Sequence, residues 1–121
     1  MAYATVNQNT KDRPTDFIDL VAPADVVPGN LLIVGPWLCV ATSKASSGSV
    51  FTADIREGQE IDCVSSVAVA AAIGDKVYYN PTTGAFAASS ATGNALVGYT
   101  TSVKDANNNF RIAKVKFATV A

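Results

Sequence analysis

The chain has no histidine, and its cysteines are few. Without histidine there is no Ser-His-Asp or Cys-His pair that could activate a nucleophile. The two cysteines, Cys39 and Cys63, stand far apart and make a poor metal-ligand set. Neither lies in a sequence setting that would activate its thiol. We therefore expect a protein that is no enzyme, needs no cofactor or metal, and keeps both cysteines as small core residues.

Charged residues are also scarce. Lys, Arg, Asp and Glu make up 16% of the chain, against roughly 25% in an average soluble domain. The formal net charge is −1, whereas a nucleic-acid binder normally carries a basic stripe. No run of about 18 apolar residues could span a membrane, and the N-terminus lacks the apolar region of a secretory signal. We therefore expect synthesis in the cytoplasm and neither a nucleic-acid nor a membrane partner.

Hydrophobic residues, in contrast, are abundant and reach 49% of the chain. A large exposed apolar patch is a liability for a monomer, so we expect apolar surface that a partner covers. The alternative is a surface rich in Ala, Ser and Thr.

A length of 121 residues suits one domain with one core. Residues 1–15 are polar, lack an apolar period and end in Arg13-Pro14-Thr15, where proline favours extended chain. We expect these residues to form a flexible N-terminal arm, and residues 16–121 to form a single β domain. Tyr3 and Val6 are the sizeable apolar side chains of the arm. The alternative is a chain terminus without a role.

Short β-rich segments separated by turn residues run through the rest of the chain, which predicts an all-β fold, a small β-barrel or sandwich. The predicted strands are 16–21, 31–34, 37–42, 50–56, 61–73, 77–79, 85–89, 96–102 and 110–120. A short helix over 67–72 is the alternative for the alanine-rich part. Along 50–56 the odd positions Phe51, Ala53 and Ile55 share one apolar face. Trp37 is expected to pack in the core rather than to anchor an interface.

Two of these strands contain irregular features. Gly98 lies inside a strand, which predicts a bulge or a close approach of another backbone. In the last strand the apolar face changes from even positions, up to Ile112, to odd positions, from Val115. A β-bulge at Ala113-Lys114 would explain this change, as would burial of both faces by a neighbouring subunit.

Clustered acidic residues are the remaining candidates for chemistry. Asp54, Glu57, Glu60 and Asp62 could form an acid–base pair, but a solvated turn is the better interpretation. The segment from Asp105 copies the first ligand positions of a calcium-binding loop. Its glycine position holds phenylalanine and its terminal glutamate position holds lysine, so we reject a calcium site.

A strand–turn–strand unit carries the most distinctive sequence. It reads GDKVYYNPTTGAFAAS over Gly74–Ser89, with a five-residue loop at Asn80–Gly84, and GNALVGY follows at Gly93–Tyr99. Upstream, Ile18–Val40 forms a compatible opening. In order and spacing these segments resemble the small capsid cement, or decoration, proteins of tailed bacteriophages, from Asp16 to Val120.

The resemblance implies a structural virion protein, made in the host cytoplasm, that binds the exterior of the expanded phage head. It implies a homotrimer that contacts the major capsid protein and stabilises the capsid lattice. The contact candidates lie in the arm and in two loops: Tyr3, Val6, Lys11, Arg13, Ser46 and Asn107. The alternative is a β-barrel binding module for a glycan or peptide, associated with a fibre, in which Tyr78 or Tyr79 would point outward.

Overall fold

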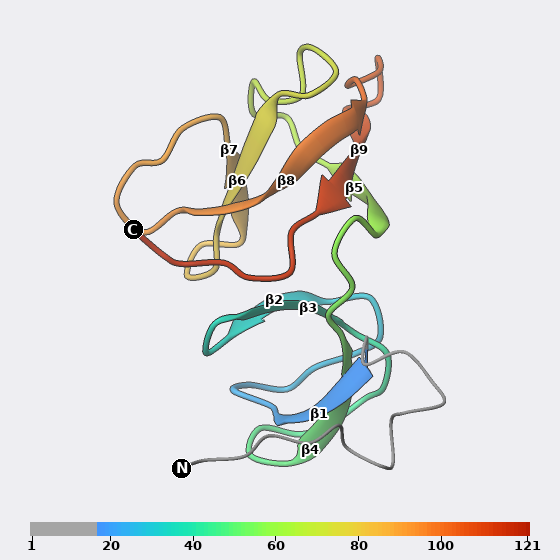
Figure 1. Ribbon diagram of the computed structural model, residues 1–121, viewed down its shortest axis with the longest axis vertical. Coiled ribbons are helices and arrows are strands. Elements are labelled where there is room, and N and C mark those ends of the chain that lie inside the picture. The colour runs from blue at the N-terminus through green and yellow to red at the C-terminus, as the bar shows by residue number, and fades with distance from the viewer. Residues whose placement is uncertain (1–16) are drawn as a thin grey trace, which may run out of the picture.

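Two antiparallel sheets make up the part of the chain that the computed structural model describes, residues 17–121 (Figure 1). The first sheet has the order β1-β4-β3-β2 and contains β1 (Phe17–Val21), β2 (Leu31–Val34), β3 (Trp37–Ala41) and β4 (Val50–Asp54). The second has the order β5-β9-β8-β6-β7 and contains β5 (Glu60–Val64), β6 (Lys76–Asn80), β7 (Ala85–Ala87), β8 (Ala95–Ser102) and β9 (Asn109–Lys114).

The described residues contain no helix, so the all-β prediction is confirmed. It follows that none of them forms a helix able to cross a membrane. The predicted arm, with Tyr3, Val6, Lys11 and Arg13, lies outside the described residues.

The first sheet encloses a core of its own. Phe51, Ala53 and Ile55 are buried together, as the alternation along β4 predicted. They pack with Cys39 of β3 and with Val26 from the loop after β1. One face of this sheet is therefore filled mainly by its own strands and loops.

The second sheet curves around another core, which includes Val77, Val97, Phe110 and Ile112. Phe86 from the edge strand β7 reaches across the curve, and its ring lies 5.5 Å from that of Phe110 on β9. Leu38 of β3 belongs to the same core, and Leu31 and Ile33 pack against it. The face of the first sheet that points away from its own core therefore covers the second core, and the two sheets are stacked.

The β6–β7 hairpin has nearly the predicted form. Asn80 pairs with Ala85 and thus belongs to the ladder, so the loop is 81–84 rather than 80–84. The Asn80 side-chain oxygen accepts hydrogen bonds from the N–H groups of Thr82 and Thr83. This Asx-type turn explains why asparagine precedes the proline.

Gly98 lies at a bulge and also at a close approach of another backbone, the two features predicted for it. A Cβ atom at this position would lie 2.5 Å from the carbonyl oxygen of Ala113. The register between β6 and β8 also shifts here, because Val77 pairs with Gly98 but Tyr78 pairs with Leu96. A glycine is therefore required for β8 and β9 to approach each other so closely.

The predicted strand over 61–73 is wrong beyond Val64, and the alternative helix over 67–72 is also absent. Local hydrogen bonds replace the ladder: the Val67 N–H donates to Ser65 Oγ, and the Ala72 N–H donates to Asp75 Oδ2. Ala70 adopts a φ of 57°, which interrupts any extended chain. Short polar side chains that bond the nearby backbone therefore prevail over the predicted extended strand.

The last strand also differs from its prediction. β9 ends at Lys114, and the expected bulge at Ala113-Lys114 is absent; the register shift lies on the β8 side, between Thr100 and Ser102. Burial at even positions continues from Phe110 and Ile112 to Lys114 itself. The apolar residues change from even to odd positions after Lys114 because β9 ends there.

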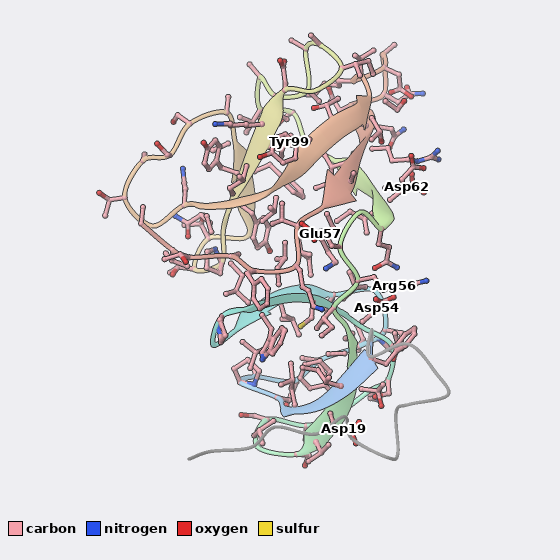
Figure 2. All side chains as sticks on the ribbon, in the orientation of Figure 1. Asp19, Asp54, Arg56, Glu57, Asp62 and Tyr99 are labelled. Carbon is pink, nitrogen blue, oxygen red and sulfur yellow. The ribbon has the colours of Figure 1, made fainter. Side chains whose placement is uncertain are left out.

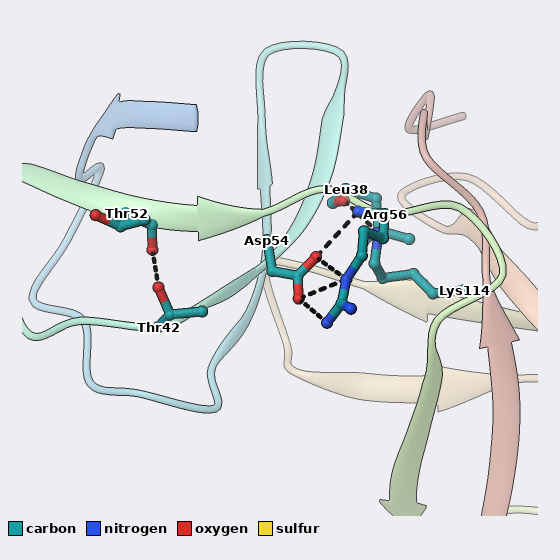
Figure 3. A network of polar contacts seen from close by, with 6 residues as sticks. All are labelled: Leu38, Thr42, Thr52, Asp54, Arg56 and Lys114. Atoms are coloured by element: carbon teal, nitrogen blue, oxygen red, sulfur yellow. Dashed lines mark hydrogen bonds and ion pairs between the residues drawn. The ribbon is translucent and has the colours of Figure 1, made fainter. Parts of the chain in front are cut away.

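The chain after β9 lies beside β3 at the positions where β4 no longer pairs with it. Val40 and Asp54 form the last β3–β4 pair, because the chain then leaves for the second sheet. The Leu38 N–H donates instead to the carbonyl oxygen of Lys116 at 3.1 Å. Lys114 Nζ donates to the carbonyl oxygen of Leu38 at 2.9 Å (Figure 3). It also donates to the carbonyl oxygen of Val115 at 3.2 Å. We call Lys114–Ala118 and the β3 backbone that it meets the junction.

Two buried charges lie at the junction. Lys114 is 1% exposed and Asp54 is 2% exposed. Burial lowers the pKa of Lys114, while the negative charge of Asp54 opposes this shift. Burial raises the pKa of Asp54, but hydrogen bonds from Arg56 outweigh it and hold that pKa below its usual value. The expectation of a solvated turn is therefore wrong for Asp54.

Replacing Gly98 tests the close approach of β8 and β9. Gly98→Val should lower the free energy of unfolding by at least about 2 kcal/mol, because the new side chain collides with the Ala113 backbone. Urea unfolding followed by circular dichroism measures the change. Thr101→Val, at an exposed position of the same strand, is the control. Equal midpoints for Gly98→Val and the unaltered protein would contradict the close packing.

Replacing Lys114 tests the junction. Lys114→Met should cost about 1–3 kcal/mol at pH 7, because the buried Leu38 carbonyl and the partly buried Val115 carbonyl lose their donor. Unfolding by urea at each pH measures this loss, with Lys76→Met on the exposed part of β6 as the control.

The same variant should alter the pH dependence of stability. Because the pKa of Lys114 is lowered in the folded protein, the unfolded chain binds more protons between that pKa and the usual value of 10.5. Stability should therefore gain a contribution as the pH rises through this window, and Lys114→Met should lack it. A pH profile identical in both proteins would contradict the burial of this amine.

Candidate partner-binding surface

The acidic residues that were candidates for an acid–base pair lie apart from one another, and three of them form ion pairs with arginines. Asp54 Oδ2 lies 2.7 Å from Arg56 Nη2 between the two sheets. Asp62 on β5 accepts a hydrogen bond from Arg111 of β9 at 2.8 Å, and Glu60 lies 3.6 Å from the same guanidinium. Figure 2 shows Asp54 with Arg56 near the first sheet and Asp62 on the second. These arginines account for three of the carboxylates as ion pairs, which favours a structural role.

The calcium-like segment is a capped turn. Asp105 Oδ1 accepts the N–H of Asn107 at 2.8 Å and the N–H of Asn109 at 3.0 Å. Asn108 has a φ of 65°, a conformation that asparagine tolerates. The Asp105 carboxylate thus stabilises the β8–β9 connection. Among residues 17–121 no cluster of three His, Cys, Asp or Glu side chains could hold a metal.

Both cysteines are buried free thiols, as predicted. Cys39 lies in the first core and Cys63 in the second. Burial raises the pKa of Cys39 to about 11 and that of Cys63 to about 12. These thiols are therefore protonated at neutral pH and poor nucleophiles.

The two loop candidates for partner contact are not brought together. Ser46 lies in the connection between β3 and β4, in the first sheet, whereas Asn107 lies in the connection between β8 and β9. In Figure 1 the β8–β9 connection is at the upper end of the molecule, and the first sheet is at the lower end. Both residues are exposed.

Four exposed apolar side chains lie on the segments at the end of the second sheet where Asn107 lies. We call them the tip surface, and its members are Val64, Val67, Ile73 and Val103. Val64 is 64% exposed and Ile73 is 66% exposed. Exposed aliphatic side chains on neighbouring loops are typical of a surface that a partner covers.

Hydrogen bonds between the two loops hold the tip surface in place. The Lys104 N–H donates to the Ala70 carbonyl at 3.1 Å, and Lys104 Nζ donates to the carbonyl of Val67. The Ser65 N–H donates to the Asn108 carbonyl at 3.0 Å. The segments 65–70 and 104–108 are thus joined by three hydrogen bonds, and the Gly74 N–H donates to the Thr100 carbonyl of β8, so both loops are held in place without a partner.

Sequence reasoning missed the tip surface because it extended the strand from Ile61 to Ile73. That prediction placed Val67 and Ile73 in one extended strand, whereas both lie in the loop after β5 and are exposed. The available signal was Ser65-Ser66, since adjacent serines favour local hydrogen bonds over a ladder.

Other apolar side chains are exposed away from the tip. Val21 and Val50 lie opposite each other in the β1–β4 ladder, and each is more than half exposed. Phe117 is exposed beside Trp37, with ring centroids 5.0 Å apart. Trp37 itself is half-buried and packs against the first core, as expected.

The tyrosines give the binding-module alternative little support. Tyr79 is half-buried and packs against Phe86, and Tyr78 is also half-buried. The tyrosine that is exposed on the second sheet is instead Tyr99 (Figure 2). Because Tyr78 and Tyr79 are adjacent in β6, Tyr78 lies on the face opposite the core, as that alternative predicted, but its side chain is half-buried.

Comparison with known proteins gives one family. The family model described as phage cement protein matches residues 13–117. No curated protein and no solved structure matches the chain. The matched residues include all strands of both sheets described above. The chain therefore belongs to the phage cement protein family, whose members have a structural role in the capsid.

Proposed function

We propose that this protein binds the outer surface of the expanded phage head and stabilises the capsid lattice through contacts with the major capsid protein. Membership of the phage cement family is the observation that carries this proposal. A protein that binds only the mature lattice stabilises it by mass action, about 2.7 kcal/mol per site at a hundredfold excess over Kd. Many modest sites then add up over the shell. No catalytic step is needed.

The tip surface is the part of the molecule best suited to face the capsid. Its valines and Ile73 expose apolar area in loops that are already fixed by hydrogen bonds, so binding orders little chain. Asn107, a predicted contact, lies on the adjoining loop. Ser46 is on the other sheet and serves a different contact or none.

Co-sedimentation with expanded heads stripped of small proteins tests the proposal, with unexpanded proheads as the control. We expect saturable binding to expanded heads alone, near one copy per major capsid subunit. Binding to neither particle, or equal binding to both, would contradict a cement function.

Charged variants test the role of the tip surface in the same assay. Ile73→Asp should weaken binding at least tenfold, because a carboxylate would be buried against the capsid. Val27→Asp adds the same charge at an exposed position in the β1–β2 connection, beside the first sheet, and should bind normally. Loss of binding in Val27→Asp with retention in Ile73→Asp would place the contact on the first sheet instead.

A homotrimer is the second part of the proposal. The exposed pair Val21 and Val50 supplies apolar area, away from the tip, for contact between copies. Light scattering at micromolar concentration should give three times the chain mass of 12.5 kDa. A monomer mass would remove the trimer while leaving capsid binding to be judged by co-sedimentation.

A further inference from the structure

A groove lies between the two edges of the second sheet. Its volume is about 400 Å³. Its apolar lining comes from both sheets: Leu31, Val40, Ile61, Cys63, Tyr79 and Phe86. It runs along β5 and reaches Phe86 of β7, so it lies where a closed barrel would have another strand.

The edge strand β5 has a row of backbone groups facing this groove. Among the described residues β5 pairs with β9 alone. The Ser65 N–H donates toward the β9 side, to Asn108, and the Gln59 carbonyl accepts from Lys114 on that side. Because antiparallel bonds alternate, the N–H groups of Asp62 and Val64 point to the opposite, free edge. A free edge of this kind is a template for one more strand.

The described chain begins close to the groove. Phe17 pairs with Asp54, Asp54 with Val40, and Val40 with Leu31. Phe17 therefore lies two strand spacings, about 10 Å, from Val40 in the groove wall. Residues paired directly across a ladder share a face, so Phe17 lies on the face of the first sheet that also carries Leu31 and Val40.

The sequence that precedes Phe17 contains a segment suited to pair with β5. Ala2–Val6 reads AYATV, and Tyr, Thr and Val are favoured in strands. Residues 7–16 follow as a polar tether, which can span up to about 33 Å. The groove has apolar walls from both sheets, so it can receive Tyr3 and Val6 although they would point to opposite faces.

We propose that Ala2–Val6 of the same chain docks in this groove as an added strand along β5, with Tyr3 and Val6 as its apolar anchors. A tethered segment is favoured over a free one because its effective concentration is high. The docked segment pairs with the Asp62 and Val64 N–H groups and covers Cys63. This inference concerns the isolated protein, so it stands or fails independently of capsid binding.

Amide hydrogen exchange of the full chain, read by NMR, tests the docking. In the unaltered protein the amides of Asp62 and Val64 should be protected, although no described strand pairs with them. The double variant Tyr3→Asp, Val6→Asp places charges on both anchors and should expose these amides, with exchange at least tenfold faster. Asn7→Asp, Asn9→Asp adds the same charge just outside the segment and should exchange like the unaltered protein.

Thiol labelling supplies a second readout. Cys63 lines the groove, whereas Cys39 is enclosed in the first core, so Cys39 is an internal control for global unfolding. Labelling of Cys63, located by mass spectrometry, should be at least tenfold faster in Tyr3→Asp, Val6→Asp, with Cys39 unchanged. Equal exchange and labelling in all variants would overturn the proposal. Protection that rises with protein concentration, together with a doubled mass, would also overturn it and assign the groove to a second copy.

Discussion

The arrangement of the two sheets depends on how the backbone of Leu38 is satisfied. β4 must leave the first sheet after Asp54, because it carries the chain to the second sheet. Leu38 would then have an unpaired N–H and an unpaired carbonyl inside the protein, which is costly. The end of β9 and the chain after it supply both partners, the Lys114 amine and the Lys116 carbonyl. Burial of this amine is compensated by two carbonyl groups and by the nearby charge of Asp54.

The junction also explains which surfaces stay available for partners. It fixes the face of β2 and β3 that carries Leu31, Ile33 and Leu38 against the second core, so this apolar area is already used. The loops at the far end of the second sheet take no part in the junction and keep Val64 and Ile73 exposed. One end of the second sheet is therefore joined to the first sheet, and the other end is free for a partner.

Features that depend on local chemistry could be predicted from the sequence. The β6–β7 hairpin follows from Asn80-Pro81 and Gly84, the burial of Phe51 and Ala53 from simple alternation, and the role of Gly98 from its place inside a strand. Features that depend on where strands end could not. The burial of Lys114 and the joining of the loops 65–75 and 103–108 follow from contacts between distant segments, which alternation along one segment does not report. Of the contact candidates, Asn107 adjoins the tip surface, while Ser46 lies on the other sheet.

Cryo-electron microscopy of expanded heads saturated with the protein would show which end of the molecule meets the capsid. We expect ordered density on the outer surface of the shell, into which the two sheets fit with the loops 65–75 and 103–108 against the capsid. The first sheet should point away from the shell. Density that fits only with the first sheet against the capsid would contradict the role of the tip surface, and the absence of added density would contradict a cement function.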